Sequence, residues 1–241
     1  MSLHPVARAS LSDHVFEQLS TEIVEGRFEP GSALPSERAL CDALQVNRGA
    51  VREAVKRLAQ AGLVVSQHGS GHQVQDFRRT AGLDLLPKLL FRADGDIDLQ
   101  VVRSVMEMRA AVGPDAAAHC ARRATAAQAA ALRHMIVEME AAGDDTALLQ
   151  GLAIQLWDHI IDGSGNIAYR LAYNALSEVY EQVRPALVEV LGDEIRDVAR
   201  CRQIVDAICS HDVDLARDVA RTLIDRGTDA LNAAIALIDL E

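Results

Sequence analysis

The sequence predicts a mainly α-helical protein in two parts: three short helices with a β-hairpin, then an all-helical antiparallel bundle of about seven helices. Composition supports this class. Hydrophobic residues make up 49% of the 241 residues and aromatic residues only 3%, while the good helix formers Ala and Leu are abundant. Strand signals are confined to one region, because short β-branched runs flanked by glycine lie before Asp76 and stop from Phe77 onwards.

Capping residues and apolar spacing predict the first two helices. Residues 10–25 begin with Ser10 or Ser12, and either hydroxyl can accept from a free first-turn N–H group. Apolar residues then recur at four-residue spacing, as Val15, Leu19 and Ile23. A Pro-Gly turn follows, and Ser36 is placed to cap a second short helix.

A third helix is predicted to begin at Asn47, a favourable capping residue, and to end at Gly62, which can adopt a left-handed conformation. Val51, Val55 and Leu58 form its apolar face. Arg48, Arg52 and Lys56 follow at four-residue intervals and therefore line one edge. Such an edge suits a helix in the major groove of DNA, where guanidinium groups reach phosphates and guanine. A solvated amphipathic helix is the alternative.

Two short strands complete the first part. Residues 63–65 and 73–75 are predicted strands, and the sequence QHGSGH between them supplies a Gly-containing turn. Three helices followed by a hairpin, with cations on the third helix, is the order of a winged helix-turn-helix. The element order therefore predicts DNA binding.

The remainder of the chain reads as helices. Residues 79–92 are a candidate linker helix interrupted at Pro87, and residues 98–123 form a long helix that Gly113 and Pro114 should kink or divide. Capping signals then mark further helices: a Thr125–Gln128 capping box, Asp144 or Asp145, Asn166, Asp193 for a helix to Ser210, and Asp212.

The charge distribution permits a nucleic-acid partner although the net charge is −11. Residues 1–76 hold 7 Lys and Arg against 9 Asp and Glu, a net of −2, and the remainder holds 17 against 26, a net of −9. Residues 48–57 alone have four cations against Glu53, a local net of +3. Local sign decides, because salt screens charges over about 8–10 Å.

Several classes are disfavoured by the sequence. There is no uncharged apolar run long enough for a membrane span and no secretory signal pattern at the N-terminus. The four cysteines lack paired metal-ligand spacing, so we expect free thiols in a cytoplasmic protein: Cys41, Cys120, Cys201 and Cys209. No nucleophile–base pair or phosphate loop stands out, which argues against an enzyme.

The stretch PGSALPSERALCDALQVNRGAVREAVKRLAQAGLV, followed by QHGSGHQV, resembles the N-terminal signature of GntR-type bacterial transcription regulators. The all-helical remainder, with GSGN at residues 163–166, is similar to the effector domain of the fatty-acid-metabolism regulator branch. This resemblance implies a DNA-binding domain over residues 1–76, a linker over 77–97 and an effector-binding and dimerisation domain over 98–241.

Carried over by position, the family's DNA contacts fall on seven residues: Arg38, Asn47, Arg48, Gly49, Arg52, His68 and Gly69. Arginines in the third helix would read guanine, and the turn between the strands would enter the minor groove. Other roles stay open for some of these side chains. Arg38 could instead pair with Glu37 or Asp42, and His68 could be an exposed turn residue. Arg57, on the flank of the helix, is expected to pair with Glu53.

Many members of this branch hold a divalent metal through one carboxylate and three histidines. Counted from GSGN, those positions fall on Ala153, Trp157, Cys201 and Leu223, none of which keeps the expected ligand type. We therefore expect no metal cofactor at the family's site. Asp158 and Asp162 with His159 could bind a metal at another position, although a solvated helix face is the simpler interpretation.

Loss of the metal with retention of the bundle resembles the acyl-coenzyme-A-responsive member of the branch. The expected effector is therefore a long-chain acyl-coenzyme A (acyl-CoA), and a metal-dependent small carboxylate is the alternative. The residues expected to line its pocket are Arg109, Trp157, Tyr173 and Tyr180. Each has a second interpretation: the aromatic residues could be core, and Arg109 could form a salt bridge within the bundle, with neighbours on the side of Glu107 or with Asp115.

The resemblance thus implies a cytoplasmic, homodimeric repressor that binds a pseudo-palindromic operator on double-stranded DNA and releases it when the effector binds. The membrane is not an expected partner. A DNA-binding protein without an effector is the rival hypothesis.

Overall fold

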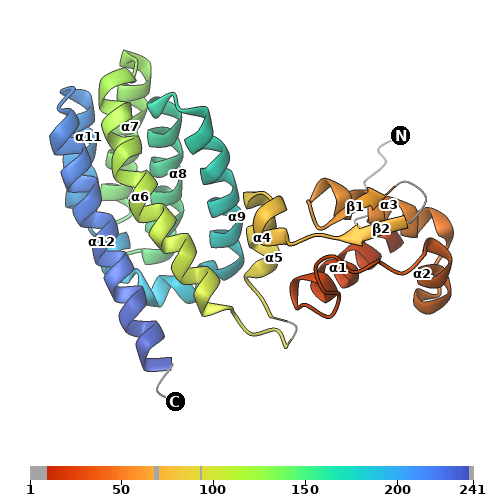
Figure 1. The fold of residues 1–241 in the computed structure, drawn as a ribbon. Coiled ribbons are helices and arrows are strands. Elements are labelled where there is room, and N and C mark those ends of the chain that lie inside the picture. Colours follow the sequence, from red (N-terminus) through yellow and green to blue (C-terminus); the bar gives the residue numbers. More distant parts are fainter. Residues whose placement is uncertain (1–9, 68–70, 93, 239–241) are drawn as a thin grey trace, which may run out of the picture. The chain divides into compact units, whose positions relative to one another are not determined.

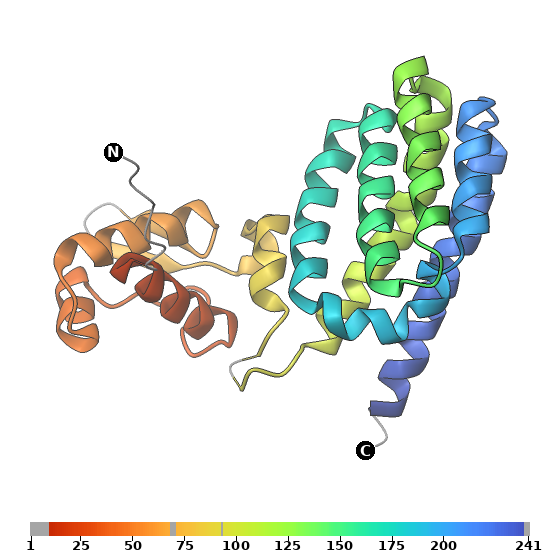
Figure 2. The ribbon, with the colours of Figure 1, turned by 180° about the vertical axis from the view of Figure 1, so that it is seen from behind.

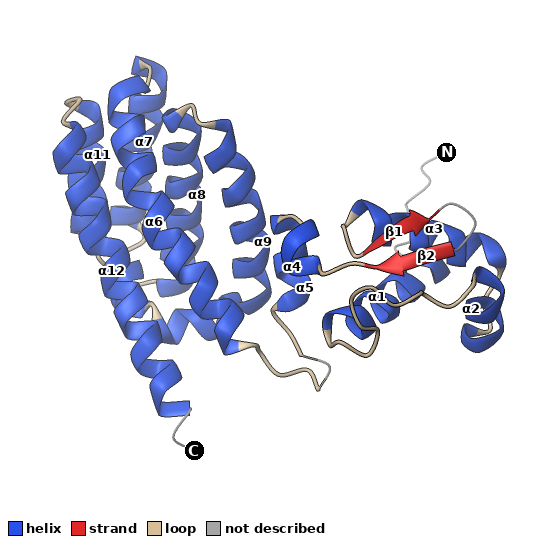
Figure 3. Ribbon diagram, viewed as in Figure 1, coloured by secondary structure: helices blue, strands red, loops and turns tan. Residues whose placement is uncertain are grey.

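The computed structural model describes residues 10–67, 71–92 and 94–238. It divides into two compact units, Met1–Ile97 and Asp98–Glu241 (Figure 1). Helices dominate both units, and the described strands belong to one hairpin in the first (Figure 3). The predicted fold class is confirmed. None of the described helices is both long and apolar enough to cross a membrane.

The first unit contains the three predicted helices, α1 (Leu11–Val24), α2 (Glu37–Leu44) and α3 (Arg48–Gln60). Ser10, Ser36 and Asn47 cap them, each side chain accepting a hydrogen bond from a first-turn backbone N–H group. These caps were predictable because each interaction spans only a few residues. Gly62, just beyond α3, has a φ of +73°, the left-handed conformation expected of it.

The hairpin pairs β1 (Val64–Gln67) with β2 (Gly71–Val74) in antiparallel register, with Val64 opposite Val74. Both valines are buried, whereas the other residues of β1 are exposed. The hairpin therefore closes one side of the core through Val64 and Val74.

Three short elements after the hairpin pack on this same core: α4 (Phe77–Thr80), the 3₁₀ helix η1 (Leu83–Leu85) and α5 (Leu86–Leu89). Leu85 is part of the buried cluster, and Phe77, Ala81 and Leu89 pack against it. The expected linker helix interrupted at Pro87 is wrong. Pro87 lies in the first turn of α5, where its missing N–H group is harmless, and the chain breaks earlier, around Ala81.

The second unit is a bundle whose described helices are α6 (Leu99–Arg123), α7 (Ala126–Ala141), α8 (Thr146–Ser164), α9 (Ile167–Val190), α10 (Gly192–Ile195), α11 (Val198–Cys209) and α12 (Val213–Ile238). The long helix α6 packs against both α8 and α12, and α11 packs against α7 and α12. Figure 2 shows α8 between α7 and α9.

Most predicted boundaries in the bundle are confirmed. Thr125 and Gln128 form the capping box of α7, Asp145 caps α8, and Asn166 caps α9 after Gly165 in a left-handed conformation. Pro114 does not divide α6, which continues through it as one helix. Its surroundings are entirely protein, because Gly113 and Pro114 are both buried.

The prediction of a single helix from Asp193 to Ser210 is wrong. The chain instead forms α10, breaks, and begins α11 with Asp197 as the N-terminal cap. Asp197 accepts from the backbone N–H of Arg200 and pairs with Arg200 and Arg226. The contact with Arg226 comes from α12, so tertiary structure selects this cap over the earlier aspartate.

Candidate functional site

The N-terminal half of α3 presents the predicted reading surface. Asn47, Arg48, Gly49 and Arg52 are all exposed, while Val51 on the opposite side of the helix is fully buried. The apolar face thus fixes the helix to the core and leaves the arginines outward. The arginine side chains are 72% and 68% exposed, enough for a nucleic acid to reach them.

Both arginines are held by a carboxylate that sequence reasoning did not assign to them. Glu37, at the first position of α2, accepts from Nε of Arg48 at 3.1 Å and from Nε of Arg52 at 3.3 Å. Burial opposes ionisation of Glu37, but the hydrogen bond from Arg48 and the charge of Arg52 lower its pKa overall. Glu37 therefore stays charged and aligns two neighbouring guanidinium groups.

Arg38 is exposed, and within the described part of the chain it has no hydrogen bond or ion pair. The alternative that pairs it with Glu37 or Asp42 is not seen, since Glu37 faces α3 instead. The remaining predicted contacts, His68 and Gly69, lie outside the described residues.

The expected pairing of Arg57 with Glu53 is wrong. Arg57 donates to Asp13 of α1 and lies over the ring of Phe16, 4.2 Å from its centroid. Glu53 is instead 3.8 Å from Lys56. Arg57 therefore joins α3 to α1 and is not part of the outward edge.

In the second unit, Arg109 of α6 makes a two-pronged ion pair with Glu194 of α10. Nη1 of Arg109 lies 3.2 Å from Oε2 of Glu194, and Nη2 donates to Oε1. The side chains are 23% and 9% exposed, so the pair is largely removed from water. The alternative interpretation, in which Arg109 forms a salt bridge within the bundle, is confirmed, but the partner is Glu194 and not Asp115.

Two predicted tyrosines lie near this pair. The Tyr173 hydroxyl donates to the carbonyl oxygen of Ile154 at 2.8 Å, and the Tyr180 hydroxyl accepts from Gln150 at 2.8 Å. Burial raises the pKa of Tyr173 to about 12 and also raises that of Tyr180. The positive charge of Arg109 opposes both pKa shifts. Arg109 is therefore close enough to Tyr173 and Tyr180 for its charge to act on both hydroxyl groups.

Trp157 of α8 packs against α6 at a glycine. A Cβ atom at Gly113 would lie 3.6 Å from the Trp157 ring and 2.3 Å from Ile224. Trp157 is only partly buried. No contact between Trp157 and Arg109 is seen, so its place in the same pocket stays a prediction.

The four positions that would hold the family's metal carry side chains that do not fit one. Leu223 is buried and has no ligand atom, and Cys201 offers only a thiol in place of the expected histidine, with burial raising its pKa to about 12. Ala153 and Trp157 offer no ligand atom. Among the described residues, no three His, Cys, Asp or Glu side chains gather as a metal site requires.

The other candidate metal ligands are already paired. Arg170 of α9 donates to Asp158 at 2.6 Å and to Asp162 at 2.5 Å. The guanidinium group therefore occupies the position between the carboxylates that a cation would take. The two carboxylate side chains are 48% and 59% exposed, as expected of a solvated helix face, and Arg170 is an additional partner for both.

A second polar cluster was not anticipated. Asp115 of α6 accepts from the Tyr169 hydroxyl at 2.7 Å and lies near His119 and Arg217. The hydrogen bond from Tyr169 is the main cause of a lowered pKa for Asp115.

We expect Tyr169→Phe to reduce stability in a pH-dependent way. Because the pKa of Asp115 is lowered in the folded protein, its stabilising contribution is present above the usual aspartate value of about 4 and is lost as pH falls through the folded value. The difference in unfolding free energy between wild type and Tyr169→Phe should therefore shrink between pH 7 and pH 3. Tyr173→Phe is the control, since its hydroxyl donates to a backbone carbonyl and its effect should change little with pH.

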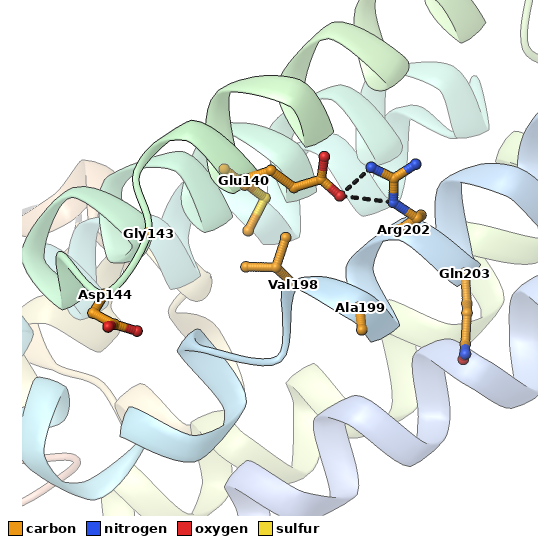
Figure 4. Close-up of a pocket in the computed structure, with 8 residues that line it drawn as sticks. Glu140, Gly143, Asp144, Val198, Ala199, Arg202 and Gln203 are labelled. Atoms are coloured by element: carbon orange, nitrogen blue, oxygen red, sulfur yellow. Dashed lines mark hydrogen bonds and ion pairs between the residues drawn. The ribbon is translucent and has the colours of Figure 1, made fainter.

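A shallow surface hollow of about 480 Å³ lies between the end of α7 and the start of α11 (Figure 4). Its lining residues are Met139, Glu140, Gly143, Asp144, Val198, Ala199, Arg202 and Gln203. Arg202 pairs with Glu140 across it, Nε to Oε1 at 2.8 Å. It contains none of the predicted effector residues.

Comparison with known proteins identifies both units. The model of bacterial regulatory proteins of the gntR family matches residues 11–74, and the FCD domain model matches residues 104–226. The chain belongs to the GntR family. It is a DNA-binding transcription regulator with an FCD effector-binding domain, and it is not an enzyme.

Relatives of this GntR-family protein have similar lengths. It is 41% identical over 235 residues to the HTH-type transcriptional regulator Mce2R of Mycobacterium tuberculosis, which covers 98% of this chain and 97% of the relative. It is 30% identical over 167 residues to the fatty acid metabolism regulator protein of Pectobacterium carotovorum, or 69% of this chain and 68% of that one. These matches support the fatty-acid-metabolism regulator branch.

Solved structures share the fold. The Lar protein, described as controlling the Listeria monocytogenes agr system, matches with a TM-score of 0.57 at 16% identity, over 95% of this chain and 99% of that one. A GntR-family regulator from Pseudomonas syringae pv. tomato matches with a TM-score of 0.50 at 17% identity, over 98% and 90%. At such identity the likeness concerns the fold alone.

Proposed function

We propose that this GntR-family regulator reads its operator with the N-terminal half of α3. The exposed edge of that helix carries the proposal: Arg48 and Arg52 project outward with Asn47 and Gly49 beside them, and Arg38 is exposed at the start of α2. Arginine forks suit the O6 and N7 atoms of guanine, and Arg38 suits a phosphate or a base. His68 and Gly69 are assigned to the minor groove by family position.

The proposed active form is a cytoplasmic homodimer. Two copies of α3 would enter successive major grooves of a pseudo-palindromic operator. Footprinting on the promoter of the protein's own gene tests this arrangement. A discrete protected palindrome is expected, while diffuse protection would favour a DNA-binding protein of weak sequence preference.

Glu37 should matter for specificity if this placement of α3 is right. With Glu37→Gln, the arginines lose their common anchor and the surface gains one net positive charge. We expect tighter binding to non-specific DNA and a fall of about threefold to tenfold in the ratio of operator to non-specific affinity.

Glu53→Gln is the matched control for that experiment. It makes the same charge change on α3, but Glu53 pairs with Lys56 and does not touch Arg48 or Arg52. Its non-specific affinity should rise while the affinity ratio stays near that of the wild type. Fluorescence anisotropy at one salt concentration measures the ratio of operator to non-specific affinity for both variants. Equal ratios would show that Glu37 acts only through its charge and not by aligning the arginines.

For the effector we propose a long-chain acyl-CoA that binds the second unit and releases the operator. Two observations support this choice. Several relatives that cover about two thirds of the chain are named fatty acid metabolism regulator protein, and Tyr173, Tyr180 and Arg109 offer polar groups within a largely apolar interior.

A thermal-shift and DNA-release experiment tests the effector. Oleoyl-CoA should raise the melting temperature of the protein and displace it from operator DNA, whereas free coenzyme A should do neither. Citrate and lactate, each with and without Zn²⁺, form the comparison series. Stabilisation by these acids only when Zn²⁺ is added would overturn the acyl-CoA assignment.

A further inference from the structure

The short helix α10 carries a carboxylate into the interior of the second unit. Glu194 is 9% exposed, and acidic side chains are rarely buried to that degree unless they are paired. Arg109 meets both of its oxygens, one with each terminal nitrogen. Charge-assisted pairing of this two-pronged kind fixes direction as well as distance. Glu194 thus occupies the two terminal nitrogen atoms of Arg109, which could equally bind another carboxylate or a phosphate.

Gly227 of α12 leaves space for the carboxylate of Glu194. A Cβ atom at Gly227 of α12 would lie 1.7 Å from Oε2 of Glu194 and 3.2 Å from Leu191. Only glycine leaves room there, although glycine inside a helix is less favourable than alanine. Arg109 and Gly227 therefore form a socket for one carboxylate.

We infer that Glu194 is an internal competitor for the anion-binding side of Arg109, and that an anionic effector must displace Glu194, and α10 with it, to bind there. The inference rests on the proposed function, since it assigns effector recognition to Arg109. The ligand chemistry is an acidic group joined to an apolar chain, because the buried Leu191 and the half-buried Tyr180 lie beside the socket.

Displacement of α10 gives the ligand a route to the rest of the bundle. The four residues of α10 connect α9 to α11 and pack against α8, α9 and α12. A ligand that replaces Glu194 therefore changes the restraints on several helices at once. Its apparent affinity is reduced by the fraction of molecules in which Glu194 still occupies Arg109.

Ligand titrations of four full-length proteins test this inference: wild type, Glu194→Gln, Gly227→Ala and Glu189→Gln. The fluorescence of Trp157, the single tryptophan, reports binding, with oleoyl-CoA in one arm and citrate in the other. Glu194→Gln removes the competing charge, and Gly227→Ala blocks the socket while keeping both charges. Glu194→Gln should bind the active probe about tenfold more tightly than wild type, whereas Gly227→Ala should bind it less tightly, because the acidic group of the ligand needs the same space as the carboxylate of Glu194. Glu189→Gln, an exposed glutamate of α9, should match wild type.

Amide hydrogen exchange supplies a readout that needs no ligand. Residues 191–197 should exchange faster in Glu194→Gln and Gly227→Ala than in wild type or Glu189→Gln. Because the two active variants disturb the pair from opposite sides, failure of one to fold leaves the other for the test. The arm in which tightening occurs identifies the source of the acidic group.

Two results would overturn the inference. If wild type binds a probe but Glu194→Gln binds it no more tightly and Gly227→Ala binds it no less tightly, the pair is purely structural and the proposed effector function stands. If no protein in the series binds either probe, the inference and the effector assignment fail together.

Discussion

Replacing Arg48 or Arg52 with alanine is expected to lower operator affinity by about 1–3 kcal/mol, a factor of about 5 to 150, at fixed salt. Each guanidinium group is exposed on α3 and aligned by Glu37. Its removal should therefore eliminate a directed contact with a base edge, and not only a positive charge near the phosphates. Fluorescence anisotropy with an operator duplex and a scrambled duplex measures the effect. The loss should concentrate on the operator.

Arg79→Ala is the control for these variants. It also removes one positive charge from the first unit, but Arg79 lies on α4, where it is 85% exposed and pairs with Asp76. Its affinity for both duplexes should change by a similar, small factor. If Arg48→Ala and Arg52→Ala behave like Arg79→Ala, α3 does not read the bases.

Arg109→Met should destabilise the second unit by about 3 kcal/mol, because it leaves the buried carboxylate of Glu194 without a partner. Urea unfolding followed by Trp157 fluorescence isolates this unit, since the single tryptophan lies on α8. The midpoint should fall with little change in the slope. The double variant Arg109→Met with Glu194→Met should recover most of the loss, because no buried charge remains.

The matched control for Arg109→Met is Arg221→Met on α12. Arg221 and its partner Asp218 are 54% and 69% exposed and 3.8 Å apart, so this surface pair contributes about 0–1 kcal/mol. A loss for Arg109→Met no larger than that for Arg221→Met would show that Glu194 is adequately solvated in the bundle. Failure of the double variant to recover stability would point to lost packing instead.

The elements that could be predicted from sequence are those decided by short-range interactions. Ser36, Asn47 and Asn166 cap their helices through contacts within three residues, so residue type and position were sufficient. The hairpin was likewise indicated by one short apolar run at residues 63–65, a second short strand at 73–75 and the glycine-containing turn between them. These local signals were enough to give the order of elements and hence the fold class.

The side-chain partners could not be predicted, because they join residues that are distant in sequence. Arg109 and Glu194 are 85 residues apart, and the pair of Arg57 with Asp13 spans 44. The local pairing of Arg57 with Glu53, one helical turn away, does not form because Arg57 contacts Asp13 and Phe16 of α1 instead. The break before α11 has the same origin, since Arg226 of α12 helps to hold Asp197.

The contact between Gly62 and Thr80 limits how the first unit can transmit movement. The Thr80 hydroxyl donates to the carbonyl oxygen of Gly62 at 2.7 Å, and a Cβ atom at position 62 would lie 2.4 Å from the Thr80 carbonyl oxygen. The end of α3 and the turn of α4 are therefore in direct backbone contact, with no side chain between them to absorb a shift. A displacement of α4 is therefore expected to move the C-terminal end of α3 with it.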